Sequence, residues 1–175
     1  MSTQFFKKNA IYLLDSSFFF STQQIPSNIV GILVITPDIL EEIKDPMNKI
    51  RIDSLISANK LSIQEGNEIK NSEFLKKFQK YSNIKRLSSA DQSLIVLALT
   101  LKEENLDKEI IIVTDDYEIQ NVSKMLEIVF QPIRNKKIMK IRKYSLKCKA
   151  CNYIVFNNED ECENCGHQSF YYKKK

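Results

Sequence analysis

Four cysteines near the C-terminus have the spacing that is most easily assigned to a chemistry. They form two CxxC pairs with ten residues between them: Cys148, Cys151, Cys162 and Cys165. Two such pairs at this separation place four thiolates around a tetrahedral structural zinc ion. A pair of disulfides is the alternative, and the cytosol disfavours it. The spacing therefore predicts a zinc ribbon, with His167 outside the ligand set because four cysteines already complete it.

Carboxylates at the ends of two apolar runs are the second group with possible chemistry. Asp15 directly follows the apolar residues 11–14, and Asp115 and Asp116 directly follow the apolar residues 110–113. Continuous apolar runs of this length are typical of strands buried on both faces in a parallel sheet. Ligands bind at the C-terminal ends of such strands. The alternative is that these acids only cap a turn or a helix.

Two further acids fall on expected helices. Glu42 lies nearer the apolar face of its helix than Glu41 does, and Asp91 follows Ser88 at the spacing of a capping box. Asp91 is therefore explained equally well as a helix cap. Hard oxygen ligands of this kind suit Mg²⁺ or Mn²⁺, and such an ion activates water for attack on a phosphodiester. The fold would have to gather these acids, because they are spread over a hundred residues.

The elements expected to position these acids alternate between strand and helix. Strands are expected at residues 11–14, 29–35, 60–65, 110–113 and 129–130. Helices are expected from Thr36-Pro37 to before Pro46, and at residues 49–58, 68–81, 92–101 and 117–127. This alternation predicts an α/β fold, a three-layer domain with a mostly parallel central sheet.

Charge divides the chain into two parts. Residues 1–130 hold 15 Lys and Arg against 18 Asp and Glu, whereas residues 131–175 hold 11 against 4. We expect a domain at 1–130, a basic connector at 131–145 with some strand character at 138–144, a zinc ribbon at 146–170 and a basic tail at 171–175. The dense basic set predicts contacts with a polyanion such as RNA, with Tyr153 available for base stacking. Its members are Arg134, Lys136, Lys137, Lys140, Arg142, Lys143, Lys147 and Lys149. A solvated spacer that contacts a protein partner is the alternative.

The composition excludes some classes of function. A hydrophobic content of 43% and a charged content of 27% are typical of a soluble globular protein. No apolar run is long enough to cross a membrane and no signal peptide is recognisable, so we expect a cytoplasmic protein without a membrane partner. A single histidine leaves little room for His-based nucleophilic catalysis.

Four segments resemble the successive motifs of PIN-domain ribonucleases. They read LLDSS, TPDILEEIKD, SSADQSLIVLAL and VTDDYEIQN. Together with the cysteines behind a basic connector, they are similar to the Nob-type endonucleases that mature the 3′ end of small-subunit rRNA. The resemblance places the family's catalytic, Mg²⁺- or Mn²⁺-binding acids on Asp15, Glu42, Asp91 and Asp116, with Asp115 able to share the last role. Where the family often has Asp-Thr-Ser, this chain has Asp15-Ser16-Ser17, which keeps a hydroxyl.

The resemblance implies a metal-dependent endoribonuclease that cleaves precursor small-subunit rRNA on the pre-ribosomal small subunit. It also implies a possible KH-domain assembly factor as a partner. A toxin-like PIN ribonuclease is one alternative, although such proteins normally lack a zinc ribbon. A non-catalytic RNA-binding assembly factor is the other, and the complete set of acids argues against it.

Overall fold

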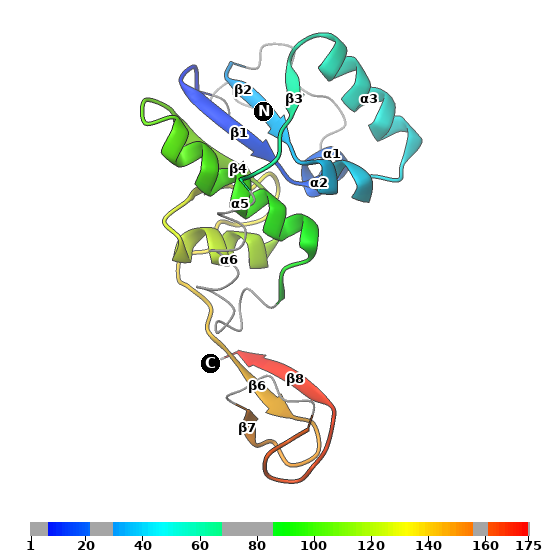
Figure 1. The fold of residues 1–175 in the computed structure, drawn as a ribbon, viewed down its shortest axis with the longest axis vertical. Coiled ribbons are helices and arrows are strands. Elements are labelled where there is room, and N and C mark those ends of the chain that lie inside the picture. The colour runs from blue at the N-terminus through cyan, green and yellow to red at the C-terminus, as the bar shows by residue number, and fades with distance from the viewer. Residues whose placement is uncertain (1–6, 22–29, 68–85, 156–160, 175) are drawn as a thin grey trace.

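The computed structural model describes residues 7–21, 30–67, 86–155 and 161–174 (Figure 1). The strands are β1 (Ala10–Leu14), β2 (Ile32–Ile35), β3 (Leu61–Ile63), β4 (Glu109–Val113), β5 (Val129–Gln131), β6 (Tyr144–Cys148), β7 (Ile154–Val155) and β8 (Phe170–Lys174). The helices are α1 (Ser16–Ser21), α2 (Pro37–Glu42), α3 (Pro46–Ser57), α5 (Ser89–Glu104) and α6 (Tyr117–Met125). The expected helix at 68–81 lies outside the described residues. None of the described helices is long and apolar enough to cross a membrane.

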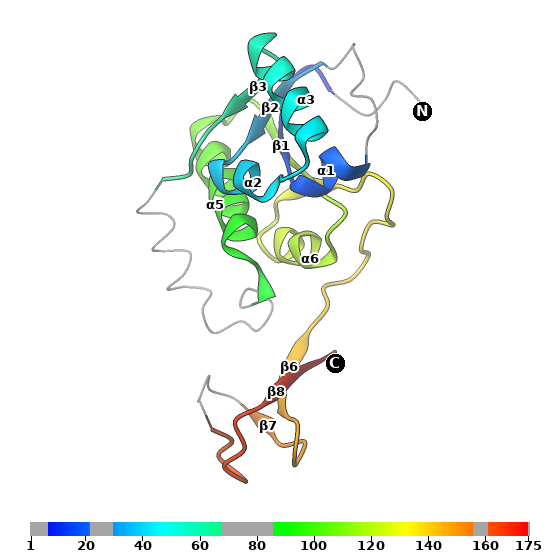
Figure 2. The same ribbon diagram turned by 90° about the vertical axis from the view of Figure 1, so that its right-hand side faces the viewer.

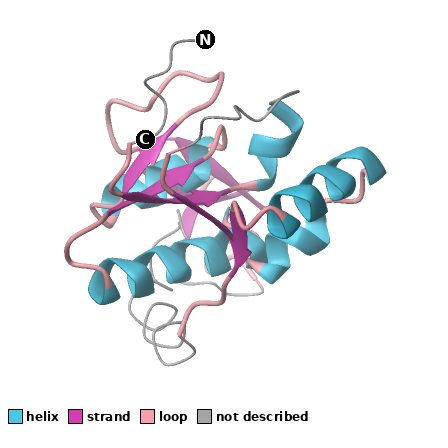
Figure 3. Cartoon of the chain, turned by 90° about the horizontal axis from the view of Figure 1, so that it is seen from above, coloured by secondary structure: helices cyan, strands magenta, loops and turns pink. Residues whose placement is uncertain are grey.

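A parallel sheet of five strands forms the centre of the larger part. Its strand order is β3-β2-β1-β4-β5, and each neighbouring pair is parallel. The expected α/β class with a parallel sheet is therefore confirmed. Strand β1 lies in the middle, and all five of its residues are buried, which explains why its apolar run does not alternate with polar residues. Helices cover both faces of this sheet in the view from above (Figure 3).

Helix starts follow the capping rules that the sequence suggests, but α3 and α5 begin earlier than expected. Helix α5 begins at Ser89 rather than at residue 92, because the cap is Ser88 and Asp91 already lies within the first turn. Thr36 caps α2 with Pro37 at the first helical position, and Ser88 and Asp91 form a complete capping box at α5. Helix α3 begins at Pro46 rather than at residue 49. The physical reason is that Asp45 caps it through the backbone amide of Asn48, so the Asp-Pro pair ends one helix and starts the next.

A second, smaller sheet carries the C-terminal cysteines. Its order is β7-β6-β8, and both pairs are antiparallel. In both side views α6 lies between this small sheet and the large sheet (Figures 1 and 2). Lys173 and Lys174, expected in a basic tail, pair with β6 as part of β8.

The segment between β5 and β6, residues 132–143, lies against α6 without forming a strand. The expected strand character at 138–144 is wrong, because β6 begins only at Tyr144. Side chains of α6 take up the backbone groups that a neighbouring strand would otherwise bind. The amide of Asn121 exchanges two hydrogen bonds with the backbone of Arg142, at 2.6 and 2.9 Å. Gln120 accepts the backbone N–H of Ile138 at 3.2 Å.

We predict that Asn121→Ala frees this segment from α6. The substitution leaves partly buried backbone groups of Arg142 without their partner, and the loss for a fully buried group would be about 1–3 kcal/mol. Trypsin should then cut within residues 134–143 faster than in the wild type, while circular dichroism shows an unchanged helix content.

The matched control is Ser123→Ala. Ser123 is equally buried on the same helix, but its hydroxyl donates to Ile119 of α6 itself. Equal protease sensitivity of the two variants would contradict this role of Asn121.

Candidate active site and cysteine cluster

Three of the predicted acids lie where the order of the parallel strands reverses. The chain passes from β1 outward to β2 and β3, and then returns to the other side of β1 with β4. Asp15 follows β1, and Asp115 and Asp116 follow β4 after Thr114. The C-terminal ends of neighbouring strands at such a reversal form the usual ligand-binding crevice of open α/β sheets.

Asp15 is buried and held by hydroxyl groups. Its side chain is 3% exposed. Its Oδ2 atom accepts hydrogen bonds from Ser17 Oγ at 2.6 Å and from Thr114 Oγ1 at 2.8 Å. Ser16 Oγ lies 3.4 Å from Oδ1. Oδ2 is therefore occupied by protein donors, whereas Oδ1 has only a weak one.

Asp91 lies close enough to the other acids to be affected by their charges. The pKa of Asp91 is raised to about 6: burial raises it most, hydrogen bonds from Ser88 act in the opposite direction, and the charges of Asp15 and Asp116 add to the rise. Its Oδ2 accepts the backbone N–H of Ser88 at 2.9 Å. Asp91 thus caps α5, as the sequence suggested, and is also a neighbour of Asp15 and Asp116.

Glu42, at the end of α2, belongs to the same neighbourhood. Burial raises its pKa first, followed by the charge of Asp15, while a hydrogen bond from Ser88 acts in the opposite direction. Residues of β1, α2, α5 and the β4–α6 turn are therefore brought to one edge of the sheet. We call Asp15, Glu42, Asp91 and Asp116 the acid edge.

The adjacent residues Asp115 and Asp116 have different surroundings. Asp115 Oδ1 accepts three backbone N–H groups, from Ile133 at 2.8 Å and from Arg134 and Asn135 at 3.0 Å each. Burial alone would raise the pKa of Asp115, but these hydrogen bonds outweigh it and lower the pKa. Asp115 therefore anchors the segment that follows β5.

Asp116 is exposed and oriented by its own turn. It caps α6 by accepting the backbone N–H of Glu118 at 2.6 Å, and its own N–H donates to Thr114 Oγ1 at 2.9 Å. Of the two aspartates, Asp116 is the one whose charge acts on Asp91.

The four cysteines come together as the sequence predicted. Within the described ranges they alone form a group of three or more ligand atoms that lie within 4.8 Å of one another, so the acid edge is more open. The sulfur atoms of Cys148 and Cys165 are 3.6 Å apart, and those of Cys151 and Cys162 are 3.7 Å apart. These are free thiols, because a disulfide would need about 2.05 Å.

Two turns of the same kind hold the cysteines. Asn152 N–H donates to the carbonyl of Cys148 at 3.0 Å, and Gly166 N–H donates to that of Cys162 at 2.8 Å. Both donors have positive φ, 60° for Asn152 and 69° for Gly166. Glycine and asparagine are the residues that tolerate this conformation best. The cluster is consistent with a zinc ribbon.

The predicted RNA-binding residues are spread over the connector and the small sheet. The side chains of Arg134, Lys136, Lys137, Lys140, Lys143 and Lys149 are exposed, and those of Arg142 and Lys147 are half-buried. Tyr153 is 37% exposed and follows the first cysteine pair.

Sequence reasoning missed a group of side chains that joins the two sheets. Arg86 forms a salt bridge with Glu118 of α6 at 3.0 Å, and its guanidinium lies 4.3 and 5.3 Å from the ring centres of Tyr144 and Tyr172. Tyr144 also donates its hydroxyl to Glu118 at 3.1 Å. We call these four residues the Arg86 clasp. The one feature of the sequence that could have indicated this group is a basic residue, Arg86, two residues before the helix cap Ser88.

We predict that Asp91→Asn stabilises the protein in a pH-dependent way when no Mg²⁺ or Mn²⁺ is added. The folded-state pKa of Asp91 is raised from its ordinary value of 3.8, so its carboxylate opposes folding above that range. Wild-type stability should therefore fall as pH rises from about 4 to about 7, and the melting temperature of the variant should exceed that of the wild type increasingly over this window.

The control for this measurement is Asp45→Asn. Asp45 also caps a helix, where a negative charge is favourable by about 0.3–1 kcal/mol, so this variant should melt below the wild type. An Asp91→Asn variant that melts below the wild type at neutral pH would contradict the raised pKa of Asp91.

Comparison with known proteins gives a consistent result. No family model matches the chain. Endoribonuclease Nob1 of Pyrococcus abyssi is 30% identical over 138 residues, which are 75% of this chain and 78% of the relative. The protein of the same name from Archaeoglobus fulgidus is 28% identical over 159 residues, 91% of this chain and 89% of the relative. Ribonuclease VapC1 of Thermoplasma acidophilum is 28% identical over 90% of this chain and 76% of its own length. With acids gathered where the strand order of a parallel sheet reverses, this similarity shows that the chain belongs to the Nob1 family of PIN-domain endoribonucleases.

Proposed function

We propose that this protein is a metal-dependent endoribonuclease that cleaves precursor small-subunit rRNA at its 3′ end. The observation that carries the proposal is the acid edge, where the charges of Asp15 and Asp116 contribute to a pKa of about 6 for Asp91. A folded protein keeps carboxylates together against their repulsion mainly at functional sites. The relatives' printed names, Endoribonuclease Nob1 and Ribonuclease VapC1, support RNA as the substrate.

Asp15, Glu42, Asp91 and Asp116 would hold Mg²⁺ or Mn²⁺. Their carboxylate oxygens are hard ligands. After burial, the charge of Asp15 also raises the pKa of Glu42 and of Asp91, and a cation would relieve that repulsion. A divalent ion here supplies positive charge for phosphodiester hydrolysis and activates water. Ser17 and Thr114 donate to Oδ2 of Asp15 and so fix the orientation of this carboxylate. Its other oxygen, Oδ1, would then be available to the metal ion. Asp115 is committed to backbone N–H groups, which favours Asp116 as the fourth ligand.

The cysteine cluster would hold one structural zinc ion. Four sulfur atoms placed tetrahedrally at about 2.3 Å from zinc lie about 3.8 Å from one another. The measured separations of 3.6 and 3.7 Å fit this arrangement. A reducing cytoplasm, where we propose that the protein acts, keeps such cysteines available as thiolates.

The basic connector would hold the RNA. Residues 1–130 carry more acidic than basic side chains and repel phosphate. Affinity for RNA would therefore come from the lysines and arginines of residues 131–149, and Tyr153 would contact a base. A solvated spacer is less consistent with the connector, because Asn121 and Gln120 bind its backbone. The substrate would be presented on the pre-ribosomal small subunit, with a KH-domain assembly factor as a possible neighbour.

Asp15→Asn tests the catalytic role. The change removes a ligand's charge and leaves its volume and the connector unaltered. We expect cleavage of a model RNA spanning the rRNA 3′ end, in the presence of Mn²⁺, to fall at least ~100-fold, or about 2.7 kcal/mol. The dissociation constant for the same RNA, measured by fluorescence anisotropy, should change less than about twofold. Asp53→Asn, an exposed acid on α3, is the control and should cleave normally. Wild-type cleavage by Asp15→Asn would refute the assignment.

Cys162→Ser tests the zinc proposal. Purified protein should contain one zinc per chain, and the variant should lose it, because structural zinc sites contribute folding energy directly. Hydrogen exchange should then show loss of protection from about residue 145 onward while the large sheet keeps its protection. The control is Ser169→Ala, a substitution in the same unit outside the cysteine set. Zinc-free wild-type protein purified under reducing conditions would contradict the proposal.

A further inference from the structure

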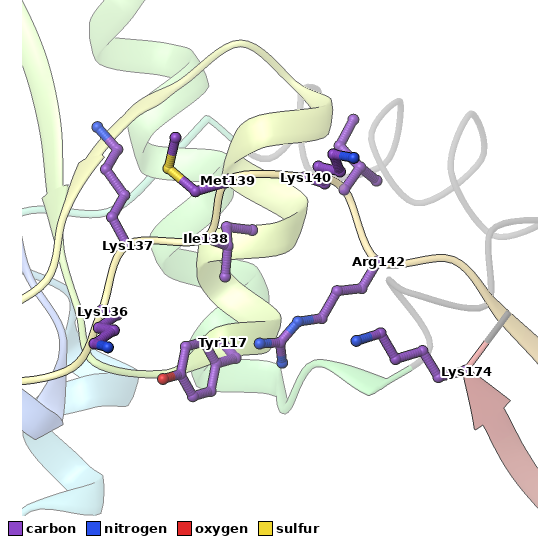
Figure 4. A pocket seen from close by; sticks show the side chains of 9 residues that line it. Tyr117, Lys136, Lys137, Ile138, Met139, Lys140, Arg142 and Lys174 are labelled. Carbon is purple, nitrogen blue, oxygen red and sulfur yellow. The ribbon is translucent and has the colours of Figure 1, made fainter.

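A pocket of about 580 Å³ lies where the connector passes the start of α6 (Figure 4). Ligand pockets in proteins usually have about 300–1,000 Å³. The pocket is lined by Tyr117, Lys136, Lys137, Ile138, Met139, Lys140, Ile141, Arg142 and Lys174. It therefore combines residues of α6, the connector and β8, three segments that are far apart in the sequence.

The charge of this pocket is positive throughout. Four cations come from the connector and the fifth, Lys174, comes from β8; none of the described lining residues is acidic. Figure 4 shows the side chains of Arg142 and Lys174 directed toward Tyr117. The guanidinium of Arg142 lies 4.3 Å from the centre of that ring. Cations that converge in this way favour an anionic ligand with delocalised charge, such as a phosphate group.

The backbone that carries these cations is fixed before any ligand binds. Gln120 and Asn121 are both 0% exposed, and they bind the backbone of Ile138 and Arg142. Lys124 donates to the carbonyl of Met139. Gln120 also donates to the carbonyl of Thr114, at the end of β4. Gln120 thus binds both the backbone of the pocket and the turn that carries Asp116, one of the four acids, and ordering the pocket's backbone adds no cost to binding.

Apolar groups lie between the charges. Met139 is 81% exposed and Ile141 is 42% exposed, although both belong to a segment rich in lysine. Ile138, between them and α6, is buried. An apolar surface bordered by cations suits a nucleotide, which presents a flat base next to a charged phosphate.

We propose that this pocket binds one nucleotide of the single-stranded RNA substrate. Arg142 and Lys174 contact its phosphate beside Tyr117, and Met139 and Ile141 contact its base. Tyr117 directly follows Asp116, so an RNA strand with a phosphate at the acid edge passes the pocket. The inference rests on the proposed function and adds four residues to the substrate-binding surface: Tyr117, Met139, Ile141 and Lys174.

Lys174 and Lys173 provide a matched pair for the test. They are neighbours in β8, so their side chains point to opposite faces of the sheet, and of the two only Lys174 lines the pocket. Lys174→Ala and Lys173→Ala remove the same charge. Both substitutions are made in the full chain carrying Asp15→Asn, and binding of a fluorescein-labelled single-stranded RNA is measured by anisotropy over a salt series.

We expect Lys174→Ala to weaken binding roughly three- to tenfold at low salt and to reduce the salt slope by about 0.7, the value for one phosphate contact on a single strand. Lys173→Ala should leave that slope unchanged. Equal effects of the two substitutions would overturn the proposal. So would competition by AMP at the concentration at which the unlabelled RNA competes, because the ligand would then be a small phosphorylated compound.

Photo-crosslinking gives an independent readout. RNA carrying 4-thiouridine next to the mapped cleavage site should crosslink to the peptide containing Met139, and Lys174→Ala should reduce that crosslink more than Lys173→Ala does. Cleavage by the chain without Asp15→Asn is measured in parallel. Cleavage without this crosslink overturns the pocket and leaves the proposed function intact. The crosslink without any cleavage supports the pocket and overturns the nuclease assignment.

Discussion

The hydrogen bond from Thr114 to Asp15 connects the two strands on which the acid edge depends. It links the C-terminal ends of β1 and β4 at the point where the strand order of the sheet reverses. The same hydroxyl oxygen of Thr114 accepts the N–H of Asp116. One buried threonine therefore sets the positions of the first and last acids relative to each other. Because Thr114 is fully buried, water does not compete for these hydrogen bonds.

Helix α6 contributes to more of the molecule than its nine residues suggest. Its first residues follow Asp116, and its buried amides bind the connector. Gln120 and Asn121 bind backbone groups of the connector that a neighbouring strand would otherwise bind. This arrangement fixes the backbone of a basic segment against the helix that Asp116 caps.

The sequence predicts the central strands well because they are buried on both faces, so their apolar runs are continuous and hard to mistake. It predicts the helix caps well because Thr36 and Ser88 act on residues within the same turn. The connector was harder: Ile138 and Ile141 suggested a strand, and nothing local shows that amides on another element bind this backbone.

Asp115 and Asp116 could not be separated from sequence for a similar reason. They are adjacent and chemically identical, and only the backbone amides of residues 133–135, distant from both until the chain folds, distinguish them. In the sequence, the capping box of α5 is a sufficient explanation for an aspartate at position 91. Only the folded chain brings the charges of Asp15 and Asp116 close enough to act on Asp91.

The Arg86 clasp has a mechanical consequence. Glu118 binds Arg86 and Tyr144 with its carboxylate and Asp116 with its backbone N–H, so the small sheet and the last acid are attached to the same residue. The position of the small sheet and the orientation of Asp116 are therefore coupled through the single residue Glu118. A displacement of the small sheet that stretched the clasp would act on the residue whose N–H group Asp116 accepts.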